Sequence, residues 1–298
     1  MTGLADLHRH LDGSVRESTL FELAAARGRA VPADLKFQPG MGLDAALARF
    51  QFILDLIAEP EKVERIAREV CEDAEADGVT TLEIRFAPQL HSGASVGETI
   101  DAALSGIAGR AGLILCGLYG EPPAVLDGHV EFARHRPGVV GIDLAGGPAS
   151  DHSWGLSAYA EPYQQATALG LGTTVHAGEG RPPAEIAAAI IELGANRIGH
   201  GTTLLDDPDV AELVAKRGTT IEACPTSNVH TGIIESVADH PLARWLERGI
   251  KVCVCPDNTY LSAVTASQEL DGAVQALGLG DDERAHMIAC GHQARFRR

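Results

Sequence analysis

Short apolar runs rich in β-branched residues recur along the whole chain, and they are apolar on both faces. This pattern is typical of strands that are buried on both sides, as in a parallel sheet covered by helices. The predicted strands lie at residues 4–8, 79–87, 112–118, 138–146, 171–178, 197–201, 219–225 and 250–256.

The segments between these runs show helical patterns rich in Ala, Leu, Glu and Arg. Residues 61–78 place their apolar side chains on one stripe and end at Gly78, where a helix stop is expected. Residues 181–194 begin with prolines near their start and end with Gly194. Residues 207–218 likewise have Pro208 near their start and end with Gly218. Each of these segments is therefore predicted to be a helix.

About eight strands that alternate with helices indicate parallel βαβ units. Eight such units favour a closed (β/α)8 barrel, the TIM-barrel fold, and a doubly wound open sheet is the alternative. The segment 9–78 is too long for one crossover helix, so we expect several helices there that cover one mouth of the barrel. No repeat or linker divides the chain, which predicts a single domain over residues 1–298.

The composition is that of an ordinary globular protein, with 298 residues, 45% hydrophobic and 22% charged. The net charge of -17 argues against non-specific binding to nucleic acid or to an anionic membrane surface. None of the six cysteines forms a C-x-x-C pair, so we expect buried thiols, with Cys253 and Cys255 in the core. Without a leader-like start or a membrane-length apolar run, we expect a soluble cytoplasmic protein.

Unusual polar residues gather at the ends of the predicted strands, where a barrel builds its active site. They are His8, His10, His176, Glu179, His200, Asp257 and Asn258. Because side chains alternate along a strand, His8 and His10 lie on the same side. With His176 and Asp257 they form a set of three imidazoles and one carboxylate, which suits zinc. The alternative is that these histidines are separate hydrogen-bonding residues.

The other polar residues at these ends each allow two interpretations. Glu179 is placed to transfer a proton beside a metal site, or it caps the N-terminus of the next helix. His200 orients or deprotonates a water molecule, or it is a plain histidine at the barrel mouth. Asp257 and Asn258 belong to the active site, or they shape a turn. The remaining histidines are expected to be surface or structural residues: His91, His129, His135, His152, His230, His240, His286 and His292.

Taken together, these segments resemble the adenosine deaminase family of the metal-dependent amidohydrolase superfamily. The resemblance runs through most of the chain in the family's order and looks bacterial. Its motifs are "DLHRHLDGS", "EIRFAPQL", "GIDLAGG", "TVHAGEG", "RIGHGTTL", "CPTSNVHTG" and "CPDN".

The resemblance implies hydrolytic removal of the amino group at C6 of a purine, with one zinc ion per chain. It implies that His8, His10, His176 and Asp257 bind zinc, that Glu179 protonates purine N1, and that His200 activates the attacking water. It further implies substrate contacts: the backbone of Gly146 with N3, Asn258 with N7, and Asp12 with the ribose end. The implied partner is a small purine nucleoside, and the sequence does not indicate an oligomeric state.

This chain also departs from the family's commonest pattern. Asn258 stands where many members have a second aspartate, and "GGP" at 146–148 replaces "GDE". Adenosine is the expected substrate, with 6-aminodeoxyfutalosine, adenine and N6-substituted adenines as alternatives. Two other classes are considered: a binuclear metal hydrolase with a bridging lysine, for which Lys216 and Lys251 are poorly placed, and a binding protein without activity.

Overall fold

Eight parallel strands form one sheet in sequence order in the computed structural model, which describes residues 3–149 and 151–297. The strands are β1 (Leu4–His10), β2 (Val79–Phe86), β3 (Gly112–Leu118), β4 (Val139–Ala145), β5 (Gly172–Ala177), β6 (Arg197–His200), β7 (Thr220–Ala223) and β8 (Lys251–Val254). All eight predicted strands are confirmed, and their order without a reversal excludes the doubly wound alternative.

The barrel closes between β1 and the residues that follow β8. Arg9 and Asp257 form an isolated parallel bridge. The His10 N–H donates to the Asp257 carbonyl at 2.8 Å, and the Asp257 N–H donates to the His8 carbonyl at 3.1 Å. The predicted (β/α)8 barrel is therefore confirmed, and its closing hydrogen bonds lie among residues predicted to bind a metal.

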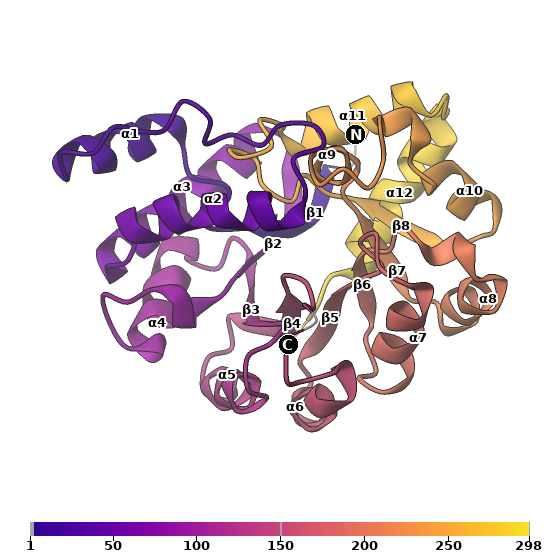
Figure 1. The fold of residues 1–298 in the computed structure, drawn as a ribbon, viewed down its shortest axis with the longest axis horizontal. Helices are drawn as coiled ribbons and strands as arrows, with labels where there is room; N and C mark the ends of the chain where they lie inside the picture. Colours follow the sequence, from indigo (N-terminus) through magenta and orange to yellow (C-terminus); the bar gives the residue numbers. More distant parts are fainter. Residues whose placement is uncertain (1–2, 150, 298) are drawn as a thin grey trace.

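Helices surround the strands, as Figure 1 shows for α4 to α8. The α-helices are α1 (Glu17–Ala26), α2 (Leu43–Leu56), α3 (Pro60–Ala76), α4 (Val96–Ile107), α5 (Ala124–Arg134), α6 (Ala160–Ala168), α7 (Pro183–Ile191), α8 (Pro208–Arg217), α9 (Pro225–His230), α10 (Leu242–Glu247), α11 (Ala266–Ala276) and α12 (Asp281–Ala294). Short 3-10 helices are η1 (Pro88–Leu90), η2 (Leu156–Tyr159), η3 (Leu204–Asp206) and η4 (Val237–Asp239).

The long connection from β1 to β2 holds α1, α2 and α3, as expected from its length. The apolar stripe of α3 is buried, and the helix begins with Pro60, whose missing N–H costs nothing at a helix start. It ends just before Gly78, whose φ of 84° is a left-handed conformation that glycine adopts without a steric penalty. Helix α3 packs against β2 and α4, so α1 and α2 are the added helices.

The chain after α12 covers the N-terminal ends of strands β4 and β5. The ring of Phe296 occupies the space above Gly172, where an added Cβ would lie 2.0 Å from the ring. The guanidinium of Arg197 stacks on the same ring at 3.6 Å from its centroid. Phe296 also donates its backbone N–H to Glu83. This segment therefore seals the end of the barrel opposite to the predicted site.

The cysteines are all buried, and none of them forms a disulfide. Cys253 and Cys255 pack with Leu7 and Cys224 in a small apolar cluster, so the prediction of core cysteines is confirmed. Among the described residues, no helix combines the length and the apolar character that a membrane span requires.

We expect the Phe296→Ala variant to lose about 2 kcal/mol of unfolding free energy, because it removes a packed ring and the stacking partner of Arg197. Urea denaturation followed by circular dichroism measures this loss. Phe21→Ala is the matched control, since Phe21 is 53% exposed on α1 and its truncation should leave stability within about 0.5 kcal/mol. Equal stability of the two variants would contradict the role given to Phe296.

Candidate active site

The barrel strands bring the predicted metal ligands together at one mouth. His8 and His10 project from β1, and His176 projects from β5. The His8 and His176 ring centroids are 4.6 Å apart, and those of His10 and His176 are 5.3 Å apart. His200 ends β6 with its ring 5.1 Å from His8, and Asp257 follows β8 beside β1. Residues far apart in sequence thus form one cluster.

The backbone at two of these positions adopts a left-handed conformation that is uncommon for residues other than glycine. His200 has a φ of 66°, and Asp257 has a φ of 62°. Such conformations cost about 1 kcal/mol or more and persist where the surrounding structure holds them. At Asp257 the two hydrogen bonds to β1 hold the backbone, so barrel closure itself orients the carboxylate.

Three distances between donor atoms lie close to those of a tetrahedral metal site, and His8, His10 and Asp257 form one group of potential metal-binding atoms. His10 Nε2 is 3.2 Å from His176 Nε2 and 3.5 Å from Asp257 Oδ1. His8 Nε2 is 3.7 Å from the same oxygen. Ligands at about 2.0–2.2 Å from zinc lie about 3.3–3.6 Å from one another in a tetrahedron. His8 Nε2 and Asp257 Oδ1 are buried without a hydrogen-bond partner in the described chain, and a cation would satisfy both.

The protonation states of His8 and His10 also suit metal binding, whereas at the buried His176 the carboxylate of Asp143 raises the pKa above its usual value. Burial and neighbouring positive charge lower the pKa of His8 and His10 well below its usual value, so both rings are neutral. Neutral imidazole is the form that binds a metal. Burial raises the pKa of Asp257 to about 6, and a cation beside this carboxylate would offset that desolvation cost. The residues present therefore fit zinc.

Carboxylates hold the second ring nitrogen of two of these histidines. His8 Nδ1 is 2.7 Å from Glu222 Oε2, and His176 Nδ1 is 3.0 Å from Asp143 Oδ2. A histidine that donates Nδ1–H to a carboxylate directs the Nε2 lone pair away from it, as in many metal sites. Burial alone would raise the pKa of Asp143, but His176 and Arg85 hold it well below its usual range.

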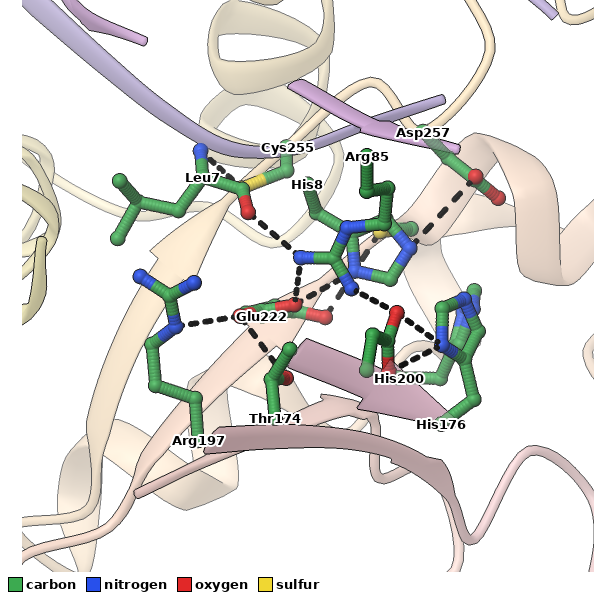
Figure 2. Close-up of polar contacts among 12 residues, drawn as sticks. Leu7, His8, Arg85, Thr174, His176, Arg197, His200, Glu222, Cys255 and Asp257 are labelled. Carbon is green, nitrogen blue, oxygen red and sulfur yellow. Dashed lines mark hydrogen bonds and ion pairs between the residues drawn. The ribbon is translucent and has the colours of Figure 1, made fainter. Parts of the chain in front are cut away.

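Arg85 joins the two carboxylates beneath the cluster, as Figure 2 shows for its contact with Glu222. Its Nη1 donates to Asp143 at 2.8 Å, and its Nη2 donates to Glu222 at 2.7 Å and to the Leu7 carbonyl at 2.6 Å. Arg197 Nε approaches the other oxygen of Glu222 at 2.6 Å. All of these side chains are buried, so their positions are mutually fixed.

Sequence reasoning did not select Arg85, Asp143 or Glu222 as site residues. Each is a charged residue inside an apolar strand run, in "EIRFA", "GIDLAG" and "TIEACP". Charged residues in a strand that is buried on both faces must be paired, and this was the signal that could have identified them.

Glu179 lies in the turn that follows β5, and its side chain is buried. Burial raises the pKa of Glu179 to about 7, because a charged carboxylate is poorly solvated there. Its Oε1 is 3.8 Å from His200 Nδ1. The next helix begins at Pro183 with Pro182 as its N-cap, so the alternative that Glu179 caps this helix is wrong.

His200 faces the same space as Glu179. Burial lowers the pKa of His200 well below its usual value, so the ring is neutral. The amide of Asn228 lies 3.1 Å from His200 Nδ1 and selects which ring nitrogen carries the hydrogen. The ring can therefore serve as a fixed hydrogen-bonding group at the mouth.

A cavity of about 460 Å³ opens above the cluster, within the size range of small-molecule sites. Asp12, Gly146 and Asn258, the predicted substrate contacts, all line it, together with Glu179 and His200. Much of the remaining wall comes from α2 and is apolar. These wall residues are Leu43, Ala46, Leu47, Phe50 and Leu54.

Asn258 depends on a close approach to glycine. A Cβ at Gly13 would lie 1.8 Å from Asn258 Oδ1, so only glycine leaves room for this side chain. Asn258 Oδ1 is buried and makes no hydrogen bond in the described residues, so this oxygen does not stabilise the turn. Gly146, with a φ of 74°, also requires glycine at the cavity wall.

Two of the histidines expected to be structural or surface residues lie near predicted site residues. His152 is half-buried and lines the cavity. His91 is buried with its Nε2 3.2 Å from Asp12 Oδ1. The His91–Asp12 contact joins segments distant in sequence, and a single histidine without a spacing pattern does not reveal it.

The fold and the cluster define a metal-dependent barrel hydrolase. The family model described as "Adenosine deaminase" matches residues 3–296. The chain is 34% identical over 308 residues to a probable adenosine deaminase of Dictyostelium discoideum, covering 95% of this chain but 39% of that relative. It is 32% identical to an adenosine deaminase of Enterococcus faecalis, covering 89% of this chain and 83% of the relative.

The chain therefore belongs to the adenosine deaminase family and is a hydrolase of the purine-deaminating type. This family membership places the chain outside the other hydrolase class that was considered. Among solved structures, the Arabidopsis N6-mAMP deaminase has a TM-score of 0.88 at 28% identity, covering 100% of this chain and 94% of that one. An adenine deaminase from Arthrobacter aurescens has a TM-score of 0.89 at 24% identity, covering 100% and 95%, which supports the fold.

We expect Glu222→Gln and Asp143→Asn each to weaken zinc affinity about 10- to 100-fold, because an amide holds the histidine ring less firmly than a carboxylate. Competition with a coloured chelator measures this affinity on the folded variants. Glu83→Gln is the control: it removes a buried carboxylate that pairs with Arg197 at 2.6 Å without touching a histidine. A similar loss of affinity in the control would contradict the assignment.

Proposed function

We propose that the protein catalyses hydrolytic deamination of a 6-aminopurine nucleoside, with adenosine as the expected substrate. The observation that carries this proposal is the His8–His10–His176–Asp257 cluster, of which His10, His176 and Asp257 line the cavity and His8 is buried beside them, next to a buried Glu179. These four residues would hold one zinc ion per chain. When bound, zinc is a Lewis acid that lowers the pKa of a water molecule to about 7.

The other polar residues at the floor would hold and transfer protons during the reaction. Addition of water to C6 of the purine places negative charge on N1 unless a proton arrives there. Glu179, whose pKa burial raises to about 7, can hold that proton at neutral pH and deliver it to N1. His200, with its tautomer set by Asn228, orients the attacking water by a hydrogen bond. Of the two protons of the added water, one restores the proton that Glu179 gave to N1 and the other passes to the amino group. Loss of ammonia then restores the aromatic ring as a 6-oxopurine.

The wall residues would orient the purine. The backbone N–H of Gly146 suits N3, and the Asn258 amide suits N7, because both ring nitrogens accept hydrogen bonds. An asparagine amide donates at every pH, whereas an aspartate donates only when protonated. Asp12 would accept a hydrogen bond at the sugar end.

The charge of the cavity favours a nucleoside over a nucleotide. Among the described residues that line it there is no lysine or arginine, whereas Asp44 adds negative charge and Asp12 is a carboxylate that already faces His91. A phosphate carries about -1.5 to -2 charges and is normally bound by cations or by free helix N-termini. The N-terminal turn of α2, which reaches the cavity, already carries Asp44. A phosphate here would therefore be poorly neutralised.

Buried, unpaired cysteines support the proposed cytoplasmic location. Cys253 Sγ and Cys255 Sγ lie 3.5 Å apart as free thiols. Burial raises the pKa of Cys255 well above its usual value, so it stays protonated. Such thiols are usual in a reducing compartment.

The substrate assignment is tested by the fall in ultraviolet absorbance on loss of the 6-amino group. The panel is adenosine, AMP, adenine, N6-methyladenosine and 6-aminodeoxyfutalosine. We expect kcat/KM for adenosine to exceed that for AMP at least tenfold, about 1.4 kcal/mol in transition-state binding. A tenfold preference for another member would replace adenosine as the substrate, and no turnover of any member would reject the proposed function.

We expect Glu179→Gln to retain zinc but to lose turnover by about 10³-fold or more, because an amide has no proton to give to N1. Metal analysis and the absorbance assay measure the two properties on one sample. Glu192→Gln on the exposed surface is the matched control and should keep full activity. Substantial turnover in Glu179→Gln would overturn the role of Glu179.

A further inference from the structure

His91 is the protein group that faces the cavity-lining carboxylate of Asp12. It follows η1 at the end of β2, and its residue is 2% exposed. Its Nε2 lies 3.2 Å from Asp12 Oδ1. In the described part of the chain, neither atom makes an aligned hydrogen bond, so the contact between them is a close ion-pair approach.

The His91 ring is held on its other sides as well. Its Nδ1 lies 3.1 Å from the Ile57 carbonyl, which can only accept, so Nδ1 carries a hydrogen. Ile57 is the C-cap of α2, where helix carbonyls lack partners and the helix dipole favours a positive group. The ring of Phe86 packs against the imidazole at a centroid distance of 5.4 Å. These contacts leave the ring one orientation.

The same contacts define the charge of the pair. Because Nδ1 donates to Ile57, an attractive contact with Asp12 requires a second hydrogen on Nε2. Burial works against a charged ring, but Asp12 and the Ile57 carbonyl raise the pKa of His91 above its usual value. A buried carboxylate without such a partner would be costly and free to rotate.

We propose that His91 is a positioning residue that holds the Asp12 carboxylate in one orientation, so that Asp12 accepts a hydrogen bond from a sugar hydroxyl of the substrate. The inference rests on the proposed function, in which Asp12 meets the sugar end. A carboxylate oxygen has lone pairs beyond the one that faces His91, and Asp12 lines the cavity. His91 also ties Asp12 to the end of α2, the helix that forms the apolar wall.

Three variants of the zinc-loaded enzyme test this inference. His91→Leu removes both polar contacts, whereas His91→Gln keeps a donor that can reach Asp12. His129→Leu is the matched control, because His129 is also 2% exposed and bonds to Gln89 at 3.0 Å, two residues before His91, whereas the ion-pair contact with Asp12 belongs to His91. Each is assayed with adenosine and with analogues that lack one sugar hydroxyl.

The wild type should lose about 10- to 100-fold in kcat/KM when the hydroxyl that Asp12 contacts is removed. With adenosine, His91→Leu should lose a similar factor in kcat/KM, mainly through a higher KM. With the analogue that lacks this hydroxyl, His91→Leu should have nearly the same kcat/KM as the wild type. The kcat/KM of His91→Gln with adenosine should lie between those of the wild type and His91→Leu. His129→Leu should keep the wild-type ratio of kcat/KM between adenosine and the analogue. The proposal would be overturned if His91→Leu lost kcat/KM by the same factor with adenosine and with every analogue, so that the ratio between these substrates did not change.

Two further measurements keep the test decisive. If His91→Leu does not fold, the substrate ratio of His91→Gln decides, and a ratio equal to that of the wild type overturns the proposal. If the wild type turns over no nucleoside, the proposed function has failed, and the role of His91 is then tested by binding instead. Calorimetric binding of the same nucleosides to the wild type and variants then supplies the ratio, and equal ratios reject the role of His91.

Discussion

The bridge that Arg85 makes between Asp143 and Glu222 supports the arrangement of the whole floor of the site. One buried guanidinium holds two carboxylates, and each carboxylate holds the Nδ1 side of a histidine. Removing one partner from such a buried set leaves an uncompensated charge, which typically costs about 3–5 kcal/mol. The same contacts that make the barrel interior stable therefore also fix the direction of two candidate metal ligands.

Barrel closure supplies the fourth candidate ligand. Asp257 is not in a strand, but its backbone exchanges hydrogen bonds with His8 and His10 across the β1–β8 seam. These bonds hold its left-handed conformation, so the carboxylate is placed only when the seam has formed. The site and the closed fold are thus coupled: an opened seam would separate a carboxylate from three imidazoles.

The strands and the residues at their ends were predictable because their signal is local. A run that is apolar on both faces marks a buried strand, and a histidine at its end stands out against that run. Arg85 also stands out as a charged residue inside an apolar run, but its partners come from β4 and β7, so only the folded barrel reveals which residues it pairs with. The Asp12–His91 contact joins the connection after β1 to the one after β2, and neither residue has a periodic partner in sequence.

The floor and the wall of the cavity come from different parts of the fold, and this difference bears on substrate specificity. The floor is built from strand ends whose positions are fixed by the buried ion pairs, whereas the wall comes from α2 and the connections around it. Changes in α2 or near Asp12 and Asn258 can therefore alter what the cavity admits without moving the donor atoms below. Two solved structures share the fold at TM-scores of 0.88 and 0.89, and their names give different purine substrates. In this chain, the wall lacks lysine and arginine among its described residues and carries Asp12 and Asp44. Under the proposed function, hydroxyl recognition and apolar packing, rather than neutralisation of a phosphate, would set the selectivity of this wall.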